Sequence, residues 1–305
     1  MREVRVRGVA VGVDGGGTAT RAVAVDATGA VVGRGTSGGA NPNSHPPEVA
    51  AANVGEAIAA AAGGRPVGAC VLGMAGTSKL ANDPVVAGLF HAAFAGAGLT
   101  EPPVVVTDAE VAFVAGTDAE AGTVVISGTG SIAMRIEGRR RAATAGGFGW
   151  LLGDEGSAFW LGREAVRTTL RALQAGVAPG PLAEAVLAAA GVSDFGPLIT
   201  ACNAAPPIRL AAYAPLVTAH VDDPVAADIV ERAALALCAE AEAAWVEGPV
   251  VLAGSVAAHD NPIGARLREL LAAHTVATAT DNAAGAAWLA SLTAFGEQPH
   301  PKHRH

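Results

Sequence analysis

Near the start of the chain, in VGVDGGGTATRAVAVD, one aspartate, three glycines and a threonine separate two apolar segments. Asp14 ends the first segment, and the residues from Gly15 to Thr18 form the turn before the second. Because glycine has no Cβ, such a turn can press backbone N–H groups against a ligand, and N–H groups that point one way attract anions. The pattern therefore indicates a turn that can bind a phosphate group.

A second turn of this kind, SGTGS at 127–131, follows the apolar run at 122–127 and repeats the strand–turn–strand pattern of the opening. Two such turns could hold one polyphosphate between two similar halves of the protein. Both differ from the Walker loop, since the sequence has no GxxxxGK[ST]. They also differ from the dinucleotide fingerprint, because their glycines join two strands and do not open a helix.

Five stretches occur in a fixed order along the chain: GVDGGGTATRAVAVD, VTDAEVAF, VVISGTGSIA, GWLLGDEGSAFWLG and VVLAGSVA. They resemble the phosphate-1, connect-1, phosphate-2 and adenosine segments of the actin/Hsp70/sugar-kinase superfamily. Within it the chain resembles the BadF/BadG/BcrA/BcrD-type ATPases and their N-acetylglucosamine kinase members, over almost its whole length. The resemblance implies an α/β fold of two actin-like (ribonuclease H-like) domains. Each would have a mixed β-sheet flanked by helices, with the active site in the interdomain cleft.

The resemblance also implies ATP and Mg²⁺ as cofactors. Asp14 would hold the metal ion through its water shell. The ATP-binding residues that match the family pattern are Gly16, Gly17, Thr18, Gly128, Thr129, Gly130, Gly254 and Ser255. The first six would contact phosphates, and their N–H groups would stabilise the charge that develops during phosphoryl transfer. Gly254 and Ser255 would lie under the adenine and ribose.

We predict that Asp108 is the general base. It follows the buried segment PVVVT, at the strand end where open α/β sheets bind ligands. It also lies near the start of a helix, where a carboxylate is stabilised. An attacking sugar hydroxyl must lose its proton, and a positioned carboxylate can accept it. The alternative is that Asp108 only caps the helix. Glu110 is predicted to be a solvated residue of the first helical turn.

Four further residues match sugar-contacting positions of the kinases that the chain resembles: Asn41, Gly76, Gly147 and Asp154. Asp108 would contact the sugar as well. The amide of Asn41 offers a donor and an acceptor to sugar hydroxyls or an N-acetyl group. Ala75 stands where some relatives have a serine, so one hydroxyl is missing here. Trp150 is interpreted as a packing residue in preference to a sugar platform.

The predicted function is an ATP-dependent kinase of an amino sugar, and the first choice is N-acetylglucosamine phosphorylated at its 6-hydroxyl. Glucosamine and N-acetylmuramic acid remain open. The lactyl group of muramic acid would need a roomy pocket around O3. We expect slow ATP hydrolysis without sugar, because domain closure would exclude water.

Two other classes of function compete with this prediction. One is the ATPase activator of a 2-hydroxyacyl-CoA dehydratase, a reductase partner that shares an iron–sulfur cluster through closely placed cysteines. Cys70, Cys202 and Cys238 are far apart in the sequence and do not resemble that arrangement. The other is a nucleotide-dependent scaffold such as actin or Hsp70. Asp108 and the sugar-type GDEGSA segment argue against it.

Composition narrows the list of partners. The 305-residue chain has a formal charge of −8, which argues against nucleic acid and against an anionic membrane surface as partners. The N-terminal apolar run is too short for a signal peptide, and no segment has the roughly 20 apolar residues of a spanning helix. We expect a cytoplasmic protein with a small-molecule amino sugar as partner. We also expect a homodimer formed through the apolar helices after residue 180.

The candidate site residues need alternating strands and helices to position them. The first half is predicted to contain strands at 8–14, 21–26 and 30–36, a helix at 47–62, and a second helix capped by Asn82 that runs to about Gly96. Later helices are predicted at 157–174, 181–190, 209–221, 224–246 and 262–274. The expected domains are 1–116 and 117–305, and a terminal helix at about 281–294 could pack back on the first. The polar tail at 297–305 is expected to fray.

Overall fold

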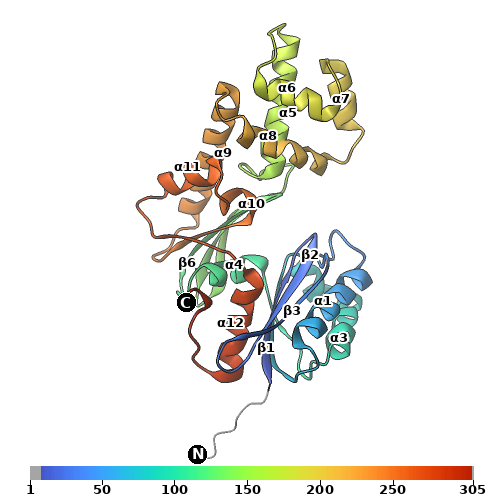
Figure 1. Ribbon diagram of the computed structural model, residues 1–305, viewed down its shortest axis with the longest axis vertical. Helices are drawn as coiled ribbons and strands as arrows, with labels where there is room; N and C mark the ends of the chain where they lie inside the picture. Colours follow the sequence, from blue (N-terminus) through green and yellow to red (C-terminus); the bar gives the residue numbers. More distant parts are fainter. Residues whose placement is uncertain (1–7, 304–305) are drawn as a thin grey trace, which may run out of the picture. The chain divides into compact units, whose positions relative to one another are not determined.

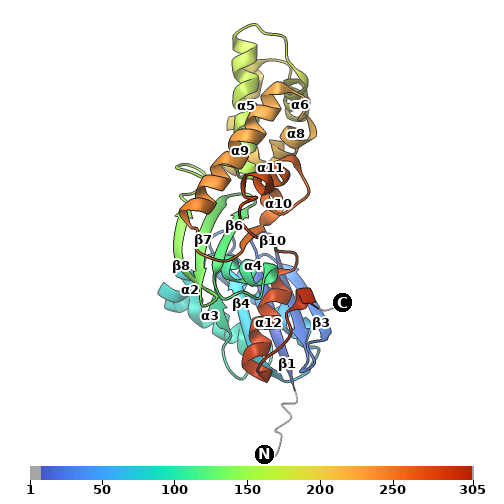
Figure 2. The same ribbon diagram turned by 90° about the vertical axis from the view of Figure 1, so that its left-hand side faces the viewer.

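The computed structural model describes residues 8–303 (Figures 1 and 2), and these form two compact units. The first unit contains the described parts of Met1–Glu120 and Ala279–His305, together with Arg139–Arg141. The second contains Ala121–Gly138 and Ala142–Thr278. The segment at 1–7, on which the signal-peptide prediction partly rests, lies outside the described residues.

The first unit is built on a five-stranded mixed sheet in the order β3-β2-β1-β4-β5. Its strands are β1 Val9–Gly15, β2 Ala19–Val25, β3 Val31–Gly38, β4 Val67–Met74 and β5 Val104–Val106. β1 pairs antiparallel with β2 and parallel with β4, which pairs parallel with β5. The continuous apolar sequence of β1 fits its central place, since a strand covered on both faces needs apolar residues on both.

Helices cover both faces of this sheet (Figure 1). α1 Pro47–Ala62 and α3 Pro84–Gly96 lie on one face, and α4 Asp108–Gly116 and α12 Asn282–Phe295 lie on the other. The backbone of α12 passes so close to β1 that a Cβ on Gly12 would collide with Ala287. The small residues therefore allow helix and sheet to approach closely, and α12 completes the core of the first unit.

The second unit repeats the topology of the first, with strand order β10-β9-β6-β7-β8. Its strands are β6 Gly122–Ser127, β7 Ser131–Glu137, β8 Arg140–Gly146, β9 Val250–Ala253 and β10 Val276–Thr278. β6 pairs antiparallel with β7 and parallel with β9, as β1 does with β2 and β4. The repeated strand–turn–strand pattern of the sequence thus corresponds to two sheets of the same topology.

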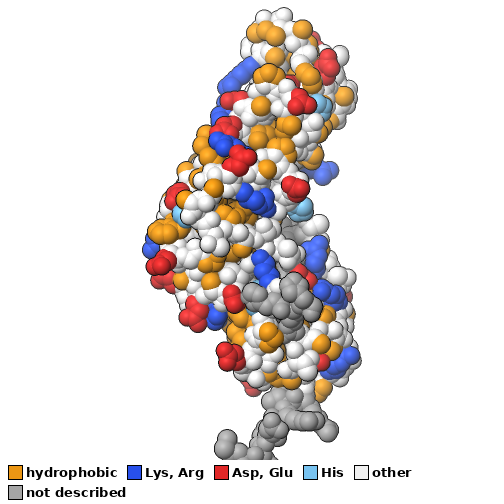
Figure 3. All heavy atoms as spheres, turned by 60° about the vertical axis from the view of Figure 1, so that its left-hand side comes forward, with side chains coloured by type: hydrophobic (Ala, Val, Ile, Leu, Met, Phe, Trp, Pro, Cys, Tyr) orange, Lys and Arg blue, Asp and Glu red, His pale blue; other side chains and the backbone are white. Residues whose placement is uncertain are grey.

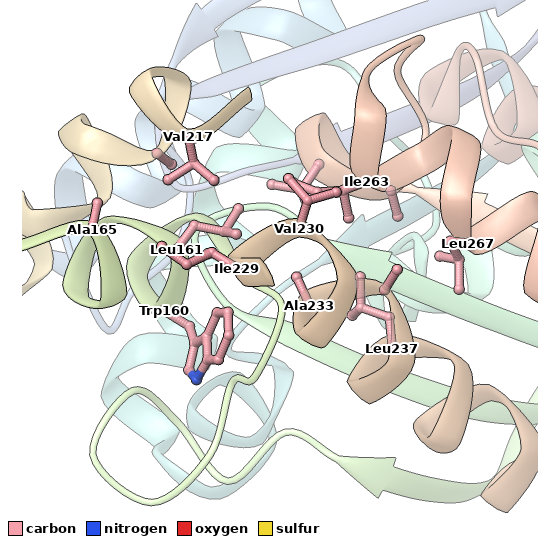
Figure 4. Close-up of a cluster of buried hydrophobic side chains, with 14 of the residues drawn as sticks. Trp160, Leu161, Ala165, Val217, Ile229, Val230, Ala233, Leu237, Ile263 and Leu267 are labelled. Atoms are coloured by element: carbon pink, nitrogen blue, oxygen red, sulfur yellow. The ribbon is translucent and has the colours of Figure 1, made fainter. Parts of the chain in front are cut away.

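A largely helical core packs beside this second sheet (Figure 4). Trp160 and Leu161 of α5, Ile229 and Leu237 of α9, and Ile263 of α11 all belong to this cluster, in which Leu161 lies beside Ile229. The helices of this unit are α5 Ala158–Gln174, α6 Pro181–Ala190, α7 Phe195–Asn203, α8 Ala214–Ala219, α9 Pro224–Ala243, α10 Gly254–Ala257 and α11 Pro262–Leu270, and the 3₁₀ helix η1 Pro207–Tyr213 precedes α8.

Some local predictions are wrong. Asp83, and not Asn82, caps α3, because its carboxylate accepts the N–H groups of Val85 and Val86. Asn82 instead ends the short helix α2 Thr77–Asn82 and donates to the Ser78 carbonyl. The helix predicted at 209–221 is divided between η1 and α8.

The C-terminal tail is not frayed as far as it is described. His300 is only 3% exposed, and its ring stacks edge-on against Trp288 of α12. Its Nε2 lies 2.7 Å from the Val114 carbonyl oxygen. A short 3₁₀ turn, η2 Pro301–His303, follows, while Arg304 and His305 lie outside the described residues. The tail is fixed to α4 and α12 because an aromatic ring and a hydrogen bond oppose its chain entropy.

Acidic and basic side chains are interspersed on the face shown in Figure 3. Within residues 8–303, no single helix is long and apolar enough to cross a membrane. The helix pair α6 and α7, bent by 55°, meets the length and composition requirements only when taken together.

Candidate active site

Strand polarity gathers several predicted site residues at one edge of the first sheet. β1, β4 and β5 run parallel, with Asp14 in register with Gly73, and Gly73 in register with Val106. Their carboxyl ends are therefore neighbours. Asp14 lies at the end of β1, Gly76 follows β4, and Asp108 follows β5, so the topology brings these three predicted residues to the same edge.

Asp14 is a largely buried carboxyl group. Its burial and the nearby Asp108 raise its pKa from about 3.8 to about 6, against the opposing effects of Arg21 and a hydrogen bond with Asn282. A buried carboxylate next to a second one is electrostatically unfavourable without a cation. This environment suits a divalent ion. No group of three or more His, Cys, Asp or Glu side chains suited to a metal occurs in the described chain, so water and phosphate oxygens would have to complete the shell.

Asp108 is the first residue of α4, and the cap of this helix is Thr107. The Thr107 hydroxyl accepts the Glu110 N–H while the Glu110 carboxylate accepts the Thr107 N–H, which is a complete capping box. Asp108 is thus not required as the cap, and its carboxylate accepts the N–H of Ala109. Burial raises the pKa of Asp108, which favours proton acceptance.

Glu110 is not the solvated residue that the sequence suggested. It is 6% exposed, and its second carboxylate oxygen accepts the backbone N–H of Arg141 and pairs with the Arg140 guanidinium. The partners lie some thirty residues away in the sequence, so no local pattern could reveal them. Glu110 therefore fixes the helix start that carries Asp108.

In the first glycine turn, at 15–18, one backbone N–H group is already used for a hydrogen bond within the turn. The Gly16 N–H donates to the Ala19 carbonyl oxygen, so it closes the turn and is not directed at a ligand. Gly17 and Thr18 are exposed, and the carbonyl of Gly17 is held by His45 Nε2 at 2.6 Å. Of the three residues predicted to contact phosphate from this turn, Gly17 and Thr18 therefore remain candidates.

The second glycine turn has a matching arrangement in the second unit. The Gly128 N–H donates to Gly130 O, while the carbonyls of Gly128 and Thr129 accept the N–H groups of Ala158 and Phe159 at the start of α5. Neither turn contains a glycine with positive φ. The turns are therefore held by ordinary hydrogen bonds and lack the alternating backbone of an ideal anion nest.

Asp154 lies directly against the second turn. A Cβ on Gly130 would be 2.8 Å from Asp154 Oδ2, and the Asp154 carboxylate accepts the N–H groups of Ser131 and Gly149, which oppose the rise in its pKa caused by burial. Asp154 is 8% exposed and has φ of 61°. Its carboxylate thus joins the predicted phosphate turn to the segment that contains Gly147.

A pocket of about 590 Å³ opens beside the second turn, entirely within the second unit. Two of the predicted ATP-binding residues, Thr129 and Ser255, line it together with His259 and Asn261. Gly254 has φ of 86°, and a Cβ there would meet the Ser127 carbonyl, so this position requires glycine.

The sequence interpretation missed the opposite wall of this pocket, which η1 and α8 supply. The small side chains that form it are Ala211, Ala212, Ala214, Pro215 and Thr218. The alanine-rich run in this segment was the available signal, since small side chains leave room for a flat ring.

Asn41 and Gly76 are in contact within the first unit. A Cβ on Gly76 would lie 2.7 Å from Asn41 Oδ1, and Lys79 Nζ donates to the Pro42 carbonyl and so fixes the loop to α2. Asn41 Oδ1 also accepts the Asn43 N–H. These two predicted sugar contacts lie together, whereas Gly147 and Asp154 belong to the second unit. Trp150 packs edge-on against Phe159, with ring centroids 5.5 Å apart.

The architecture is shared with solved sugar-kinase structures. A crystal structure from Chromobacterium violaceum, provisionally assigned as an N-acetylglucosamine kinase, is 27% identical and has a TM-score of 0.71, covering 93% of this chain and 99% of that one. The predicted α/β class, with two mixed sheets flanked by helices, is confirmed. A model of the BadF/BadG/BcrA/BcrD ATPase family matches residues 11–290, and the chain belongs to this family.

Two curated relatives match shorter stretches. The N-acetyl-D-glucosamine kinase of Dictyostelium discoideum is 31% identical over 175 residues, which are 53% of this chain and 54% of the relative. The N-acetylmuramic acid/N-acetylglucosamine kinase of Clostridium acetobutylicum is 43% identical over 68 residues, 22% of each chain. The matches thus span about half and about a fifth of the relatives' lengths.

Proposed function

We propose that the protein is an ATP-dependent amino-sugar kinase that phosphorylates N-acetylglucosamine at its 6-hydroxyl. The observation that carries this proposal is the pair of buried carboxyl groups, Asp14 and Asp108, at the carboxyl edge of the first sheet. In a chain of this ATPase family, one carboxylate suits a magnesium ion and the other suits a hydroxyl proton. The names of the relatives favour an amino sugar as the acceptor.

Most of the predicted residues have a role in this proposal, whereas Gly16 and Gly128 use their N–H groups to close their own turns. Asp108 accepts the proton of the attacking hydroxyl, and Asp14 would hold a hydrated Mg²⁺, which would supply positive charge to neutralise the phosphates. Gly17 and Thr18 from one turn, and Thr129 and Gly130 from the other, donate to phosphates. Gly254 and Ser255 form the floor of the adenosine pocket. Asn41, Gly76, Gly147 and Asp154 bind or shape the sugar site. A cytoplasmic homodimer remains part of the proposal.

The test is ADP release from Mg·ATP with N-acetylglucosamine, glucosamine, N-acetylmuramic acid and glucose in parallel. The Asp108→Asn variant should lower kcat by about 10²–10⁴-fold, while ADP binding measured by calorimetry persists. ³¹P–¹H correlation spectra of the product identify the phosphorylated oxygen. Turnover of no amino sugar, or an unchanged rate in Asp108→Asn, would contradict the proposal.

The pH profile offers an independent check. If Asp108 is the base, kcat/KM falls toward acid pH as its carboxylate becomes protonated, and burial places this fall above the ordinary range of an aspartate. At saturating Mg²⁺, which would keep Asp14 ionised, Asp108→Asn should remove the acid limb from whatever activity remains. Asp118→Asn, which changes an aspartate of the same unit beyond the C-terminal end of α4, is the matched control and should retain the limb.

A further inference from the structure

The first unit contains a pocket of about 640 Å³ that no step of the proposed reaction uses. It lies between α2, α3 and the segment that enters β5, and Arg141 closes one side. Its lining includes Gly76, Thr77, Ser78, His91, Pro103 and Arg141. We call this cavity the Arg141 pocket.

The pocket adjoins the predicted sugar position, because Gly76 belongs to both. The backbone of Gly76 contacts the side-chain amide of Asn41, and the same glycine lines the pocket. A sugar that lies on Asn41 and Gly76 would therefore have this cavity beside it, within reach of a group attached to its ring.

Arg141 is fixed close to the reaction edge. Its backbone N–H donates to Glu110 Oε1, whose partner oxygen accepts from the N–H and hydroxyl of Thr107. Thr107 caps the helix that begins with Asp108. Arg141 is thus held by its backbone beside the first turn of α4, while its side chain reaches the pocket.

The charge of the pocket is opposite to that of the whole chain. Arg141 and His91 line it, and the lining residues include no aspartate or glutamate, although the chain has a net charge of −8. Within the described residues the Arg141 guanidinium has no ion-pair or hydrogen-bond partner, whereas neighbouring Arg140 pairs with Glu110. A guanidinium presents a fork of N–H donors that matches a carboxylate.

We propose that the Arg141 pocket binds a carboxylate-bearing substituent of the acceptor amino sugar, with Arg141 as the residue that recognises the carboxylate. The inference rests on the proposed kinase function and extends its acceptors from N-acetylglucosamine to amino sugars with an acidic ether group. Thr77 and Ser78 add hydroxyl donors at the end nearest the sugar. The cavity is large enough to accept a group of several heavy atoms, so the substituent need not displace the protein.

The experiment compares three acceptors: N-acetylglucosamine, N-acetylmuramic acid and the neutral amide of N-acetylmuramic acid. For each, kcat and KM are measured in the wild type, Arg141→Ala and Arg140→Ala. Both substitutions remove an arginine side chain, and Arg141→Ala keeps the backbone N–H that Glu110 binds. The neighbouring Arg140 does not line the pocket, so it is the matched control.

We expect Arg141→Ala to lower the ratio of kcat/KM for N-acetylmuramic acid to that for N-acetylglucosamine by about ten- to hundredfold, through KM, as expected for a lost charged hydrogen bond. Arg140→Ala should change this ratio by less than about threefold. The amide should bind more weakly than the acid in the wild type and equally in Arg141→Ala. Phosphorylation of N-acetylglucosamine without turnover of N-acetylmuramic acid, or an unchanged ratio in Arg141→Ala, would overturn the inference while leaving the kinase proposal intact.

If no sugar is phosphorylated, the kinase proposal fails and calorimetry decides the question of the pocket. Binding of N-acetylmuramic acid that is lost in Arg141→Ala and retained in Arg140→Ala upholds the carboxylate site. Absence of binding to the wild type at millimolar ligand overturns it.

Discussion

Glu240, on α9, holds its carboxyl group against the backbone of Gly146, the last residue of β8, so closely that a Cβ at this glycine would collide with it. One carboxyl oxygen, Oε2, is buried without a hydrogen-bond partner. Burial, together with Glu155 and Asp154, raises the pKa of Glu240 to about 7. The segment that contains the proposed sugar contacts Gly147 and Asp154 therefore lies against a carboxyl group that is partly protonated at neutral pH.

The linked pH dependence has a definite sign. Since the pKa of Glu240 is higher in the folded protein than its ordinary value near 4.5, folding is favoured by its protonated form. That contribution is complete below about pH 4.5 and is lost as the pH rises through about 7. Glu240→Gln, which stays neutral, should raise the Tm at pH 8 by on the order of 2 °C and have little effect at pH 5. Thermal scans from pH 5 to 8 measure this, with the exposed Glu247→Gln as control. A gain that is the same at both pH values would contradict the electrostatic cause.

Asp14→Asn should have opposite effects on activity and on stability. Its pKa is raised from about 3.8 to about 6 because the ligand-free protein buries the carboxylate beside Asp108. That shift corresponds to a penalty on the order of 2–3 kcal/mol once the group is charged, which grows between pH 3.8 and 6. Asp14→Asn should therefore stabilise the ligand-free protein at pH 8 and leave its stability at pH 4 nearly unchanged.

The same substitution should lower kcat by roughly a hundredfold or more, because a neutral amide is a poor anchor for hydrated Mg²⁺. Urea unfolding at the two pH values and steady-state kinetics over a Mg²⁺ titration measure the two effects. Loss of both activity and stability at pH 8 would show that Asp14 is needed for the fold and not for the metal ion.

Substituting Gly254 tests the floor of the proposed nucleotide pocket. Gly254 and Gly176 both have positive φ, at 86° and 66°, but a Cβ would strike the Ser127 carbonyl at the first position and meet nothing within 4 Å at the second. Gly176→Ala should therefore cost only backbone strain, about 1 kcal/mol. Gly254→Ala should cost more, about 2–4 kcal/mol, and weaken ADP binding. Equal thermal stabilities and equal ADP affinities in the two variants would show that the close approach to Ser127 is unimportant.

The sequence predicts the repeated sheets well because their evidence is local. Apolar runs that end at Asp14 and Ser127, each followed by a glycine turn, indicate strand boundaries directly. By contrast, β8 has the sequence RRAATAG and is mostly exposed, so no alternation of apolar residues indicates a strand. It becomes one by pairing at the edge of the second sheet, which is a tertiary effect.

In the candidate site too, some features have local sequence evidence and others depend on tertiary contacts. Asp14 and Asp108 could be chosen from their positions after apolar strands. The burial of Glu110, the contact of Glu240 with Gly146 and the Arg141 pocket all depend on residues far apart in the sequence. A single sequence contains no periodic signal for such pairs, so the charge environment of the site could not be predicted.

The C-terminal tail is expected to stabilise the first unit. Trp288 of α12 donates its indole N–H to Gln298 O, its ring meets His300 edge-on at 4.7 Å, and His300 Nε2 lies 2.7 Å from Val114 O. These contacts join the tail to two helices that cover the first sheet. His300→Ala should therefore destabilise the protein by about 1–3 kcal/mol, measured by urea unfolding.

His300→Phe separates the two causes of this loss. Phenylalanine keeps a ring against Trp288 and removes the hydrogen bond to Val114 O. If the hydrogen bond dominates, this variant is as unstable as His300→Ala, since the Val114 carbonyl oxygen is then left without this partner in a buried place. If ring packing dominates, His300→Phe retains most of the wild-type stability. Wild-type stability in both variants would show that the tail adds nothing to the first unit, because neither the ring nor its nitrogen could then be holding α4 and α12 together.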